Sequence, residues 1–291
     1  MEKILTLRLR NQQSIEFCEP VVMGIINVSP NSFYRPHGNV VAAVHTAQQM
    51  IAEGAQILDV GGEATNPFVD IEKASPTVQQ EIDRVVPVVE AIKQDCDVLV
   101  SVDTSCAEVM RASVAVGADI INDQRALRRG DAMATVGALQ TPVCLMHFFT
   151  PMRQPDTCDF SALFKRIQED LMHAVKQCEQ HGIARDRIIL DPGFGGGNFG
   201  KSTDENYSLL AHVPSLVALG FPLLSGWSRK SMIGDTLQVP PEERLYGSII
   251  ADAFAIFHGA AIIRTHDVKA ASDAIKVAMK IKKFSRQEEW V

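Results

Sequence analysis

Side chains that can hydrogen-bond or carry charge stand directly after short apolar runs along most of this chain. In chain order they are Asn27, Asp59, Asp103, Asn122 with Asp123, His147, Asp191, the segment Ser228-Arg229-Lys230, and Arg264 with His266. A carboxylate only accepts hydrogen bonds, whereas an amide both donates and accepts. This mixture suits the donor edge of a flat nitrogen heterocycle, and the residues assigned to that edge are Asn27, Asp103, Asn122, Asp123 and Asp191.

Basic residues follow the last two apolar runs, at Lys230, Arg264 and His266. Arginine grips a phosphate through two parallel hydrogen bonds, and lysine acts on it as a point charge. These residues predict a site for a phosphate-type group beside the heterocycle. Asn27 offers a hard oxygen ligand to Mg²⁺, an ion that usually binds together with substrate phosphates.

A Gly-rich segment at residues 195–202 offers an alternative chemistry. Its letters fit the pattern G-x-x-x-x-G-K-S/T, with Lys201 in the position that touches phosphate in ATP-hydrolysing enzymes. However, Asp191-Pro192-Gly193-Phe194 separates it from the preceding apolar run, where a phosphate-binding loop turns almost at once. We favour a flexible loop, because glycine adopts backbone conformations that are closed to other residues.

The apolar runs are rich in Val, Ile and Leu without polar alternation, as strands buried on both faces require. The eight predicted strands are Val21–Ile26, Gln56–Val60, Val98–Val102, Asp119–Ile121, Pro142–Met146, Arg187–Leu190, Phe221–Leu224 and Ala260–Ile263. The amphipathic segments that predict helices are Val40–Glu53, Thr77–Gln94, Ala107–Val116, Asp131–Leu139, Phe160–His181, Asp204–Ala218, Glu243–Phe257 and Val268–Lys283. Eight alternating strands and helices predict an α/β fold, the (β/α)₈ TIM barrel. An open doubly wound sheet is the alternative, but it needs a Gly-rich fingerprint after an early strand, and none is present.

The first twenty residues precede these units. Ile4–Leu9 and Ser14–Cys18 predict an N-terminal β-hairpin that covers the bottom of the barrel. No linker divides the remainder, so we predict a single domain over residues 1–291, with the hairpin in 1–20 and the barrel in 21–283. Active sites of TIM barrels lie at the carboxyl ends of the strands, so the polar residues are predicted to meet at one rim.

The composition argues against several classes of protein. The 291 residues are 46% hydrophobic and 22% charged, which is close to average for globular proteins. A net charge of −7 argues against broad affinity for nucleic acids or anionic membranes. We expect neither a signal peptide nor a membrane span. The six cysteines form no C-x-x-C pair, and they predict a cytoplasmic protein without a zinc cluster.

Eight segments resemble the motifs of dihydropteroate synthases, and together they cover the chain from about residue 21 to 283. They are Met23–Phe33, Ile57–Thr65, Ser101–Thr104, Ile121–Asp123, Leu145–His147, Leu190–Gly195, Ser228–Ser231 and Ile263–Val268. The resemblance implies a TIM-barrel transferase of folate biosynthesis. Such an enzyme condenses 6-hydroxymethyl-7,8-dihydropterin diphosphate with p-aminobenzoate and releases 7,8-dihydropteroate and diphosphate.

The resemblance also implies roles for individual residues. The pterin is expected to contact Asp103, Asn122, Met146, Asp191, Lys230 and Arg264. Diphosphate and the cofactor Mg²⁺ are expected near Asn27, Thr65, Arg264 and His266. The p-aminobenzoate is expected near Phe194, Phe199 and Ser228. The residues expected to be catalytic are Asp103, Lys230, Arg264 and His266, and the family is usually homodimeric.

Three loop segments depart from the family pattern. Asn31 stands where an aspartate is usual, Asn66 stands where an arginine is usual, and residues 196–202 contain an insertion. Arg35 and His37 are the candidates to compensate for the missing charged pair. Two alternatives therefore stay open. One is a catalytically altered paralogue that still binds pterin, and the other is a pterin-dependent methyltransferase, which has less use for the basic cluster.

Overall fold

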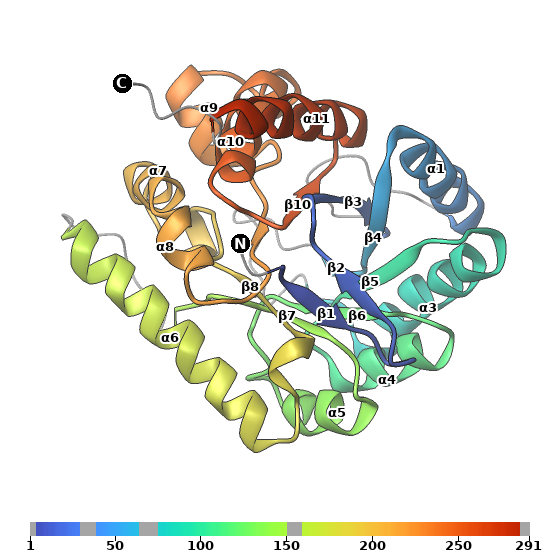
Figure 1. Cartoon of the computed structure of the whole chain (residues 1–291). Helices are drawn as coiled ribbons and strands as arrows, with labels where there is room; N and C mark the ends of the chain where they lie inside the picture. Colours follow the sequence, from blue (N-terminus) through green and yellow to red (C-terminus); the bar gives the residue numbers. More distant parts are fainter. Residues whose placement is uncertain (1–3, 30–38, 64–74, 150–158, 286–291) are drawn as a thin grey trace.

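Eight parallel strands form a barrel in the computed structural model, which describes residues 4–29, 39–63, 75–149 and 159–285 (Figure 1). Around the barrel their order is β8-β7-β6-β5-β4-β3-β10-β9. The strands are β3 (Val21–Asn27), β4 (Ala55–Gly61), β5 (Leu99–Asp103), β6 (Ile120–Asp123), β7 (Val143–Met146), β8 (Ile188–Asp191), β9 (Leu224–Ser225) and β10 (Ile262–Thr265). A parallel bridge between Leu190 and Leu223 joins β8 to the chain before β9 and nearly closes the ring. The predicted (β/α)₈ barrel is confirmed.

Helices surround the strands, and most of them begin and end within two residues of the predicted bounds. They are α1 (Val40–Glu53), α3 (Val78–Asp95), α4 (Ala107–Ala115), α5 (Ala132–Leu139), α6 (Phe160–Gln180), α7 (Thr203–Ala211), α8 (Val213–Val217), α9 (Ser231–Leu237), α10 (Leu245–Phe257) and α11 (Val268–Ser285). Short 3₁₀ turns lie at Arg185–Arg187, Gly197–Phe199 and Pro241–Glu243. None of the described helices is long and apolar enough to cross a membrane.

Two helical predictions were incomplete. The segment expected to be one helix over 204–218 is split into α7 and α8, because Pro214 has no N–H and starts a new helix at its first turn. The seven-residue α9 was not predicted, since about two turns are too few to show a helical period.

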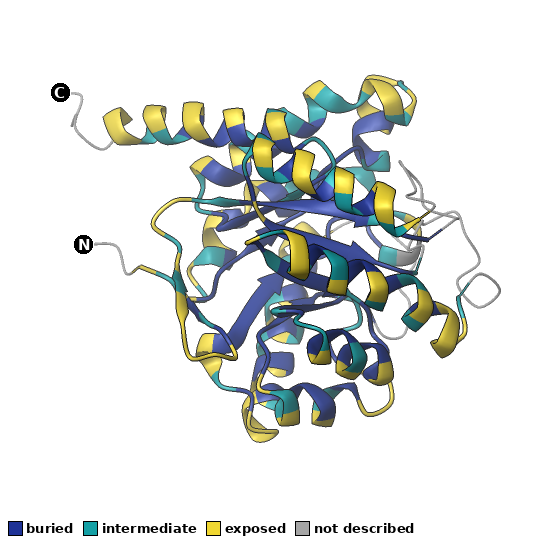
Figure 2. Cartoon of the chain, turned by 90° about the vertical axis from the view of Figure 1, so that its right-hand side faces the viewer, coloured by how far each residue is buried: buried dark blue, intermediate teal, exposed yellow. Residues whose placement is uncertain are grey.

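The N-terminal hairpin is confirmed, and it covers the barrel end opposite the strand tips. β1 (Thr6–Arg8) pairs antiparallel with β2 (Ser14–Glu16). In the side view of Figure 2 the hairpin lies at one end and the strand arrows point towards the other. Leu7 is completely buried within the lower end of the barrel, and Arg8 pairs with Asp186 at 2.9 Å.

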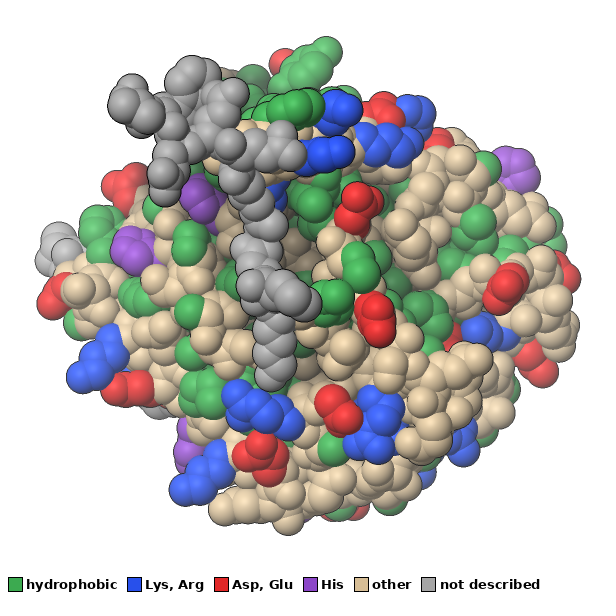
Figure 3. Space-filling model, viewed as in Figure 1, with side chains coloured by type: hydrophobic (Ala, Val, Ile, Leu, Met, Phe, Trp, Pro, Cys, Tyr) green, Lys and Arg blue, Asp and Glu red, His purple; other side chains and the backbone are tan. Residues whose placement is uncertain are grey.

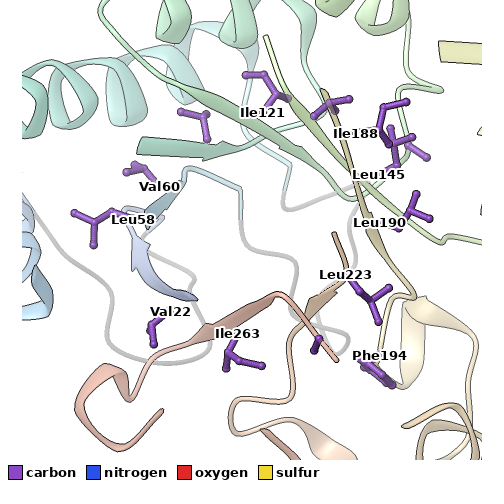
Figure 4. Close-up of a cluster of buried hydrophobic side chains, with 14 of the residues drawn as sticks. Val22, Leu58, Val60, Ile121, Leu145, Ile188, Leu190, Phe194, Leu223 and Ile263 are labelled. Atoms are coloured by element: carbon purple, nitrogen blue, oxygen red, sulfur yellow. The ribbon is translucent and has the colours of Figure 1, made fainter. Parts of the chain in front are cut away.

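Two apolar layers hold the barrel together. Side chains that point outward pack between strands and helices, and Figure 4 labels several of them, among them Val22, Leu58 and Ile263. A smaller cluster fills the lower part of the interior, and its members are Leu7, Met23, Ile57, Ile120, Cys144, Ile189, Leu224, Ala261 and Ile262. Because side chains alternate along a strand, the residue two positions further on points into the barrel again, nearer its upper end. On β4, β6, β8 and β10 those positions hold Asp59, Asn122, Asp191 and Arg264.

Candidate active site

Arg264, the inward-facing cation of β10, lies at the centre of this polar upper layer. Its Nε donates to Asp59 Oδ2 at 2.7 Å, and its Nη2 donates to Asp103 Oδ2 at 2.9 Å. One guanidinium therefore joins carboxylates of two other strands, β4 and β5. Burial opposes its charge, but the Asp59 and Asp103 carboxylates outweigh burial and raise the pKa of Arg264 further above its usual range.

Two amides from the end of β6 complete this arrangement. Asn122 Nδ2 donates to Asp59 Oδ2 at 3.0 Å, and Gln124 Nε2 donates to Asp103 Oδ2 at 2.7 Å. Burial raises the pKa of Asp103 to about 7, although Arg264 and Gln124 both lower it. Asp103 can therefore change its charge near neutral pH.

Asp191 and Lys230 form the next part of the rim. Burial raises the pKa of Asp191 against the opposing effect of Lys230, and Gly193 N donates to Asp191 Oδ1 at 2.7 Å. Lys230 Nζ donates to the carbonyl oxygen of Phe194. Burial lowers the pKa of Lys230 to about 8, despite the Asp191 carboxylate. An acceptor and a donor thus stand side by side, as recognition of an amide-like heterocycle edge requires.

The Phe199 ring lies at the Lys230 side of the rim, in the short turn that follows Gly196. Lys230 Nζ is 5.4 Å from the centre of this ring. Gly195 makes the approach possible, because a Cβ at that position would lie only 2.5 Å from the Phe199 ring. Phe199 therefore offers an aromatic face beside the basic residues.

Ser228 and His266 are joined across the ends of β9 and β10. The backbone N–H of His266 donates to Ser228 Oγ at 3.1 Å, and Ser228 Oγ lies 2.9 Å from His266 Nδ1. This contact fixes the orientation of the imidazole ring at the end of β10. Arg229 fixes this segment through a two-point ion pair with Asp267, with nitrogen–oxygen distances of 2.7 and 2.8 Å.

Of the remaining predicted site residues, two lie on described strands and one lies outside the described residues. Asn27 and Met146 end β3 and β7, and the alternation of the strands turns both into the upper end of the barrel. Thr65 lies outside the described residues, and so do the altered loop positions Asn31, Arg35 and Asn66. Of the predicted set, the structure brings together in one rim Asn27, Asp103, Asn122, Met146, Asp191, Ser228, Lys230, Arg264 and His266.

Two predicted site side chains point away from the cleft. The Phe194 ring is completely buried in the outer core, where its centre lies 5.1 Å from that of Trp227; only its carbonyl oxygen reaches Lys230 (Figure 4). Gly193, directly before it, has a positive φ of 70°, a backbone conformation that favours glycine. Asp123 follows the inward-facing Asn122 and so points outward. There it accepts hydrogen bonds from Ser105 and from two backbone N–H groups of its own loop.

Lys201 rules out the ATPase alternative on geometric grounds. Its side chain is 1% exposed, and its Nζ donates to Gly193 O at 2.8 Å. The segment that follows is the start of α7, where Ser202 caps the helix. A lysine held inside the protein below the loop cannot reach a nucleotide phosphate. His147 is likewise a buried core residue, and its Nδ1 lies 3.5 Å from Lys201 Nζ. Burial lowers the pKa of His147 to about 4.

Asp59 and Gln124 are site residues to which sequence reasoning assigned no role. Asp59 had a visible signal, since it stands inside the apolar run Ile57–Val60, and a charge in a buried strand needs a partner. It is completely buried, and no described residue bonds its Oδ1. Gln124 gave no comparable signal, because a polar residue just past a strand end is ordinary in a loop.

Comparison with known proteins agrees with this geometry. The family model described as pterin binding enzyme matches residues 23–266. The dihydropteroate synthase of Escherichia coli (strain K12) is 45% identical over 267 residues, which cover 91% of this chain and 92% of that protein. The chain belongs to the dihydropteroate synthase family. The family member from Haemophilus influenzae is 40% identical, over 92% of this chain and 96% of its own length.

Solved structures of the family superpose closely on this barrel. A Coxiella burnetii dihydropteroate synthase in complex with pteroic acid matches with a TM-score of 0.92 and 55% identity, over 96% of this chain and 99% of that chain. The Xanthomonas albilineans enzyme in complex with 7,8-dihydropteroate matches with a TM-score of 0.81 and 40% identity, over 95% and 98%. Dihydropteroate synthase activity, a transferase reaction of folate biosynthesis, is the function of this chain.

Proposed function

We propose that the upper rim of the barrel is where 6-hydroxymethyl-7,8-dihydropterin diphosphate reacts with p-aminobenzoate. The pterin head lies against Asp103, Asn122, Asp191 and Lys230, with Met146 on its face. The observation that carries this proposal is the convergence of acceptors and donors around Arg264, within hydrogen-bonding distance of one another and at the end of the barrel where TIM-barrel enzymes act. That end contrasts with the apolar filling below it.

The pterin is held by groups of matched polarity. Asp103 and Asp191 accept from its ring N–H and amino groups, and Lys230 donates to a ring acceptor. All three side chains are largely withdrawn from water, so these charge-assisted bonds are stronger than they would be on an exposed surface. The carboxylates also stabilise the positive charge that develops on the pterin as the diphosphate leaves.

The reaction exchanges one bond at the methylene carbon. The carbon–oxygen bond breaks and its electron pair leaves on the diphosphate. The nitrogen of the neutral aryl amine supplies the pair for the new carbon–nitrogen bond and then loses a proton. Arg264 and His266 stabilise the charge that grows on the leaving group, which is electrostatic catalysis. The aryl amine is nucleophilic without deprotonation, so the site needs no strong base.

Asn27 is the residue that would hold Mg²⁺. An inward-facing amide oxygen at a strand end fits this role, because Mg²⁺ usually takes only one or two protein ligands and completes its shell with water and phosphate. The ion would neutralise the diphosphate and make it a better leaving group. The Phe199 ring lies beside Lys230 and Ser228 lies beside His266, and we assign the aminobenzoate to these two residues.

A product assay tests the proposal. The protein, dihydropterin diphosphate, Mg²⁺ and p-aminobenzoate are expected to yield dihydropteroate and one equivalent of diphosphate. Lys230→Ala is expected to lower turnover about a hundredfold or more, the usual loss for an electrostatic group of an active site. Lys269→Ala removes a lysine of α11 that only pairs with Asp273, and it serves as the matched control. Pterin binding without product would favour the catalytically altered paralogue.

We also propose that the enzyme is a homodimer. Large apolar side chains of α10 and α11 line one shallow groove and face solvent, and Tyr246, Ile250 and Val277 are 79%, 72% and 61% exposed. Exposed apolar patches of this kind mark association surfaces, and a two-fold axis would pair the groove with itself. Ile250→Asp is expected to convert the dimer to monomer in sedimentation experiments.

A cytoplasmic location is supported by the thiols. Each cysteine that the structure describes is free, and Cys106, Cys144 and Cys178 are buried. Unpaired thiols are typical of proteins kept in a reducing compartment.

A further inference from the structure

The two carboxylates that flank Arg264 are held in the same way. Asp59 Oδ2 accepts from Arg264 Nε and Asn122 Nδ2, and Asp103 Oδ2 accepts from Arg264 Nη2 and Gln124 Nε2. Both amides come from one segment, two residues apart at the end of β6. In each carboxylate these two donors converge on Oδ2, and Asp59 Oδ1 has no hydrogen-bond partner among the described residues.

Asp59 and Asp103 nevertheless differ in what they can reach. Asp59 is completely buried, whereas 12% of the Asp103 side chain is exposed at the top of β5. The second oxygen of Asp103 is therefore the one available to a substrate. With one oxygen bound at two points, the carboxylate cannot rotate freely about its Cβ–Cγ bond.

We propose that Gln124 is a positioning residue for the pterin, because it holds Asp103 Oδ2 against Arg264 and so presents Oδ1, in its charged form, to the ring. This inference rests on the pterin site proposed above and adds a residue to it. Gln124 acts through Asp103 and does not itself contact the reacting atoms. Its amide favours the carboxylate form, because an N–H group bonds an ionised oxygen more strongly than a protonated one.

The charged groups around Asp103 have opposing effects on its pKa, so a hydrogen bond from Gln124 can influence its ionisation. Burial and the carboxylates of Asp59 and Glu63 oppose its ionisation, while Arg264 favours it. Lys230 and Arg125 also interact electrostatically with Asp103. Arg125 forms an ion pair with Glu63, however, in which Arg125 Nη1 lies 3.1 Å from Glu63 Oε2. The opposing influences bring the pKa of Asp103 to about 7. The Gln124 hydrogen bond therefore adds to Arg264 as a second influence that favours the charged form of Asp103.

The test is the pH dependence of pterin binding, measured as the dissociation constant of 6-hydroxymethylpterin diphosphate by fluorescence between pH 5.5 and about 9, a range that spans the relevant ionisations. The unsubstituted protein is expected to lose affinity as the pH falls through the Asp103 pKa. In Gln124→Leu this acidic limb is expected to move upward by roughly one pH unit, since one unit corresponds to about one hydrogen bond. The alkaline limb set by Lys230 stays in place.

Two further variants serve as controls for Gln124→Leu. Gln124→Asn keeps the amide but is one methylene too short to reach Asp103, so the same upward shift is expected. Gln168→Leu makes the same substitution at a half-buried glutamine of α6, and it is expected to leave both limbs unchanged. An unshifted acidic limb in both Gln124 variants overturns the role of Gln124, whereas absence of pterin binding by the unsubstituted protein at any pH overturns the proposed site itself.

Discussion

The two ends of the barrel interior are lined by side chains of opposite polarity. At the lower end nine apolar side chains fill the space, and the hairpin residue Leu7 is among them. Above them the same strands present Asp59, Asp103, Asn122, Asp191 and Arg264. The outer surface near the hairpin carries acidic and basic side chains mixed together, as Figure 3 shows, and no large region of one sign. The upper interior instead brings charged side chains together where water is scarce.

The apolar lower layer contributes to stability, whereas the charged upper layer serves function. Burial of apolar side chains stabilises the fold wherever they are, so the lower layer contributes to stability without any chemistry. Burial of carboxylates costs free energy unless cations and donors compensate. Arg264 compensates two carboxylates at once, and the amides of β6 add a donor to each. The upper layer is thus maintained at some cost to stability because a charged, pre-organised site binds a polar substrate.

Arg264→Ala is expected to have the largest effect. It leaves Asp59 and Asp103 buried without their shared cation, so unfolding free energy falls by roughly 3–5 kcal/mol, the usual result of breaking a buried ion pair. Turnover is expected to fall about a hundredfold or more. Chemical denaturation and the product assay measure the two effects. Adding Asp59→Asn restores part of the stability and none of the turnover, and recovery of activity in that double variant would contradict the proposed role.

Leu7→Ala is expected to lower the stability of the protein without lowering its pterin affinity or turnover. Removing a buried leucine side chain lowers the unfolding free energy by roughly 2–5 kcal/mol. Because the lower layer has no part in binding, pterin affinity and turnover of the folded protein stay unchanged at a temperature where both proteins are folded. Thr6→Ala, at an exposed position of the same strand, is the matched control. A changed pterin affinity in Leu7→Ala would show that the two layers are coupled.

Asp252 extends the comparison, because it is a buried carboxylate that pairs with no cation among the described residues. It lies on α10, completely buried, and neither oxygen has a hydrogen-bond partner among the described residues. Burial raises the pKa of Asp252 well above its usual value, and the Asp267 carboxylate adds to the effect. The folded state therefore holds a proton that the unfolded chain releases above about pH 4, so this group lowers stability as the pH rises.

Asp252→Ala is expected to raise the unfolding free energy at pH 7 by roughly 1–3 kcal/mol, the cost of an unsatisfied buried group. The gain shrinks as the pH falls towards 4, where the unfolded chain holds its proton as well. Asp252→Asn, which keeps the shape but cannot ionise, is expected to remove the same pH dependence. Denaturation curves at pH 4 and 7 provide the measurement, and a loss of stability in Asp252→Ala at pH 7 would mean that the carboxyl has a stabilising partner.

The arrangement of strands and helices followed from the sequence wherever the local signal was long. The helix Val40–Glu53 has its predicted bounds, and the strand beginning at Val21 ends only one residue later than expected. The strand predicted at Phe221–Leu224 is instead the two-residue β9. Pro222 has no N–H to give to a neighbouring strand, and the barrel closes there through a single bridge. Apolar composition alone does not show where pairing stops.

The site was predictable in its members but not in their directions. Strands buried on both faces have no polar alternation, so the sequence does not reveal which of two adjacent polar residues points inward. Asn122 and Asp123 illustrate this, since the first contacts Asp59 and the second caps its own loop. For Phe194 the direction depends on a turn at Gly193, and for Gln124 it depends on β5 lying beside β6. These are properties of the folded barrel, not of a local sequence.

The most direct test of the account is the affinity of the Asp103→Leu variant for 6-hydroxymethylpterin diphosphate, with its thermal midpoint measured in parallel. If the charged upper layer exists to bind the pterin, the dissociation constant rises about tenfold to a hundredfold, as loss of a charge-assisted hydrogen bond implies. The thermal midpoint falls, because Arg264 loses one of its two carboxylate partners, but the ion pair with Asp59 remains and the protein still folds. An unchanged dissociation constant in a folded variant would contradict the account.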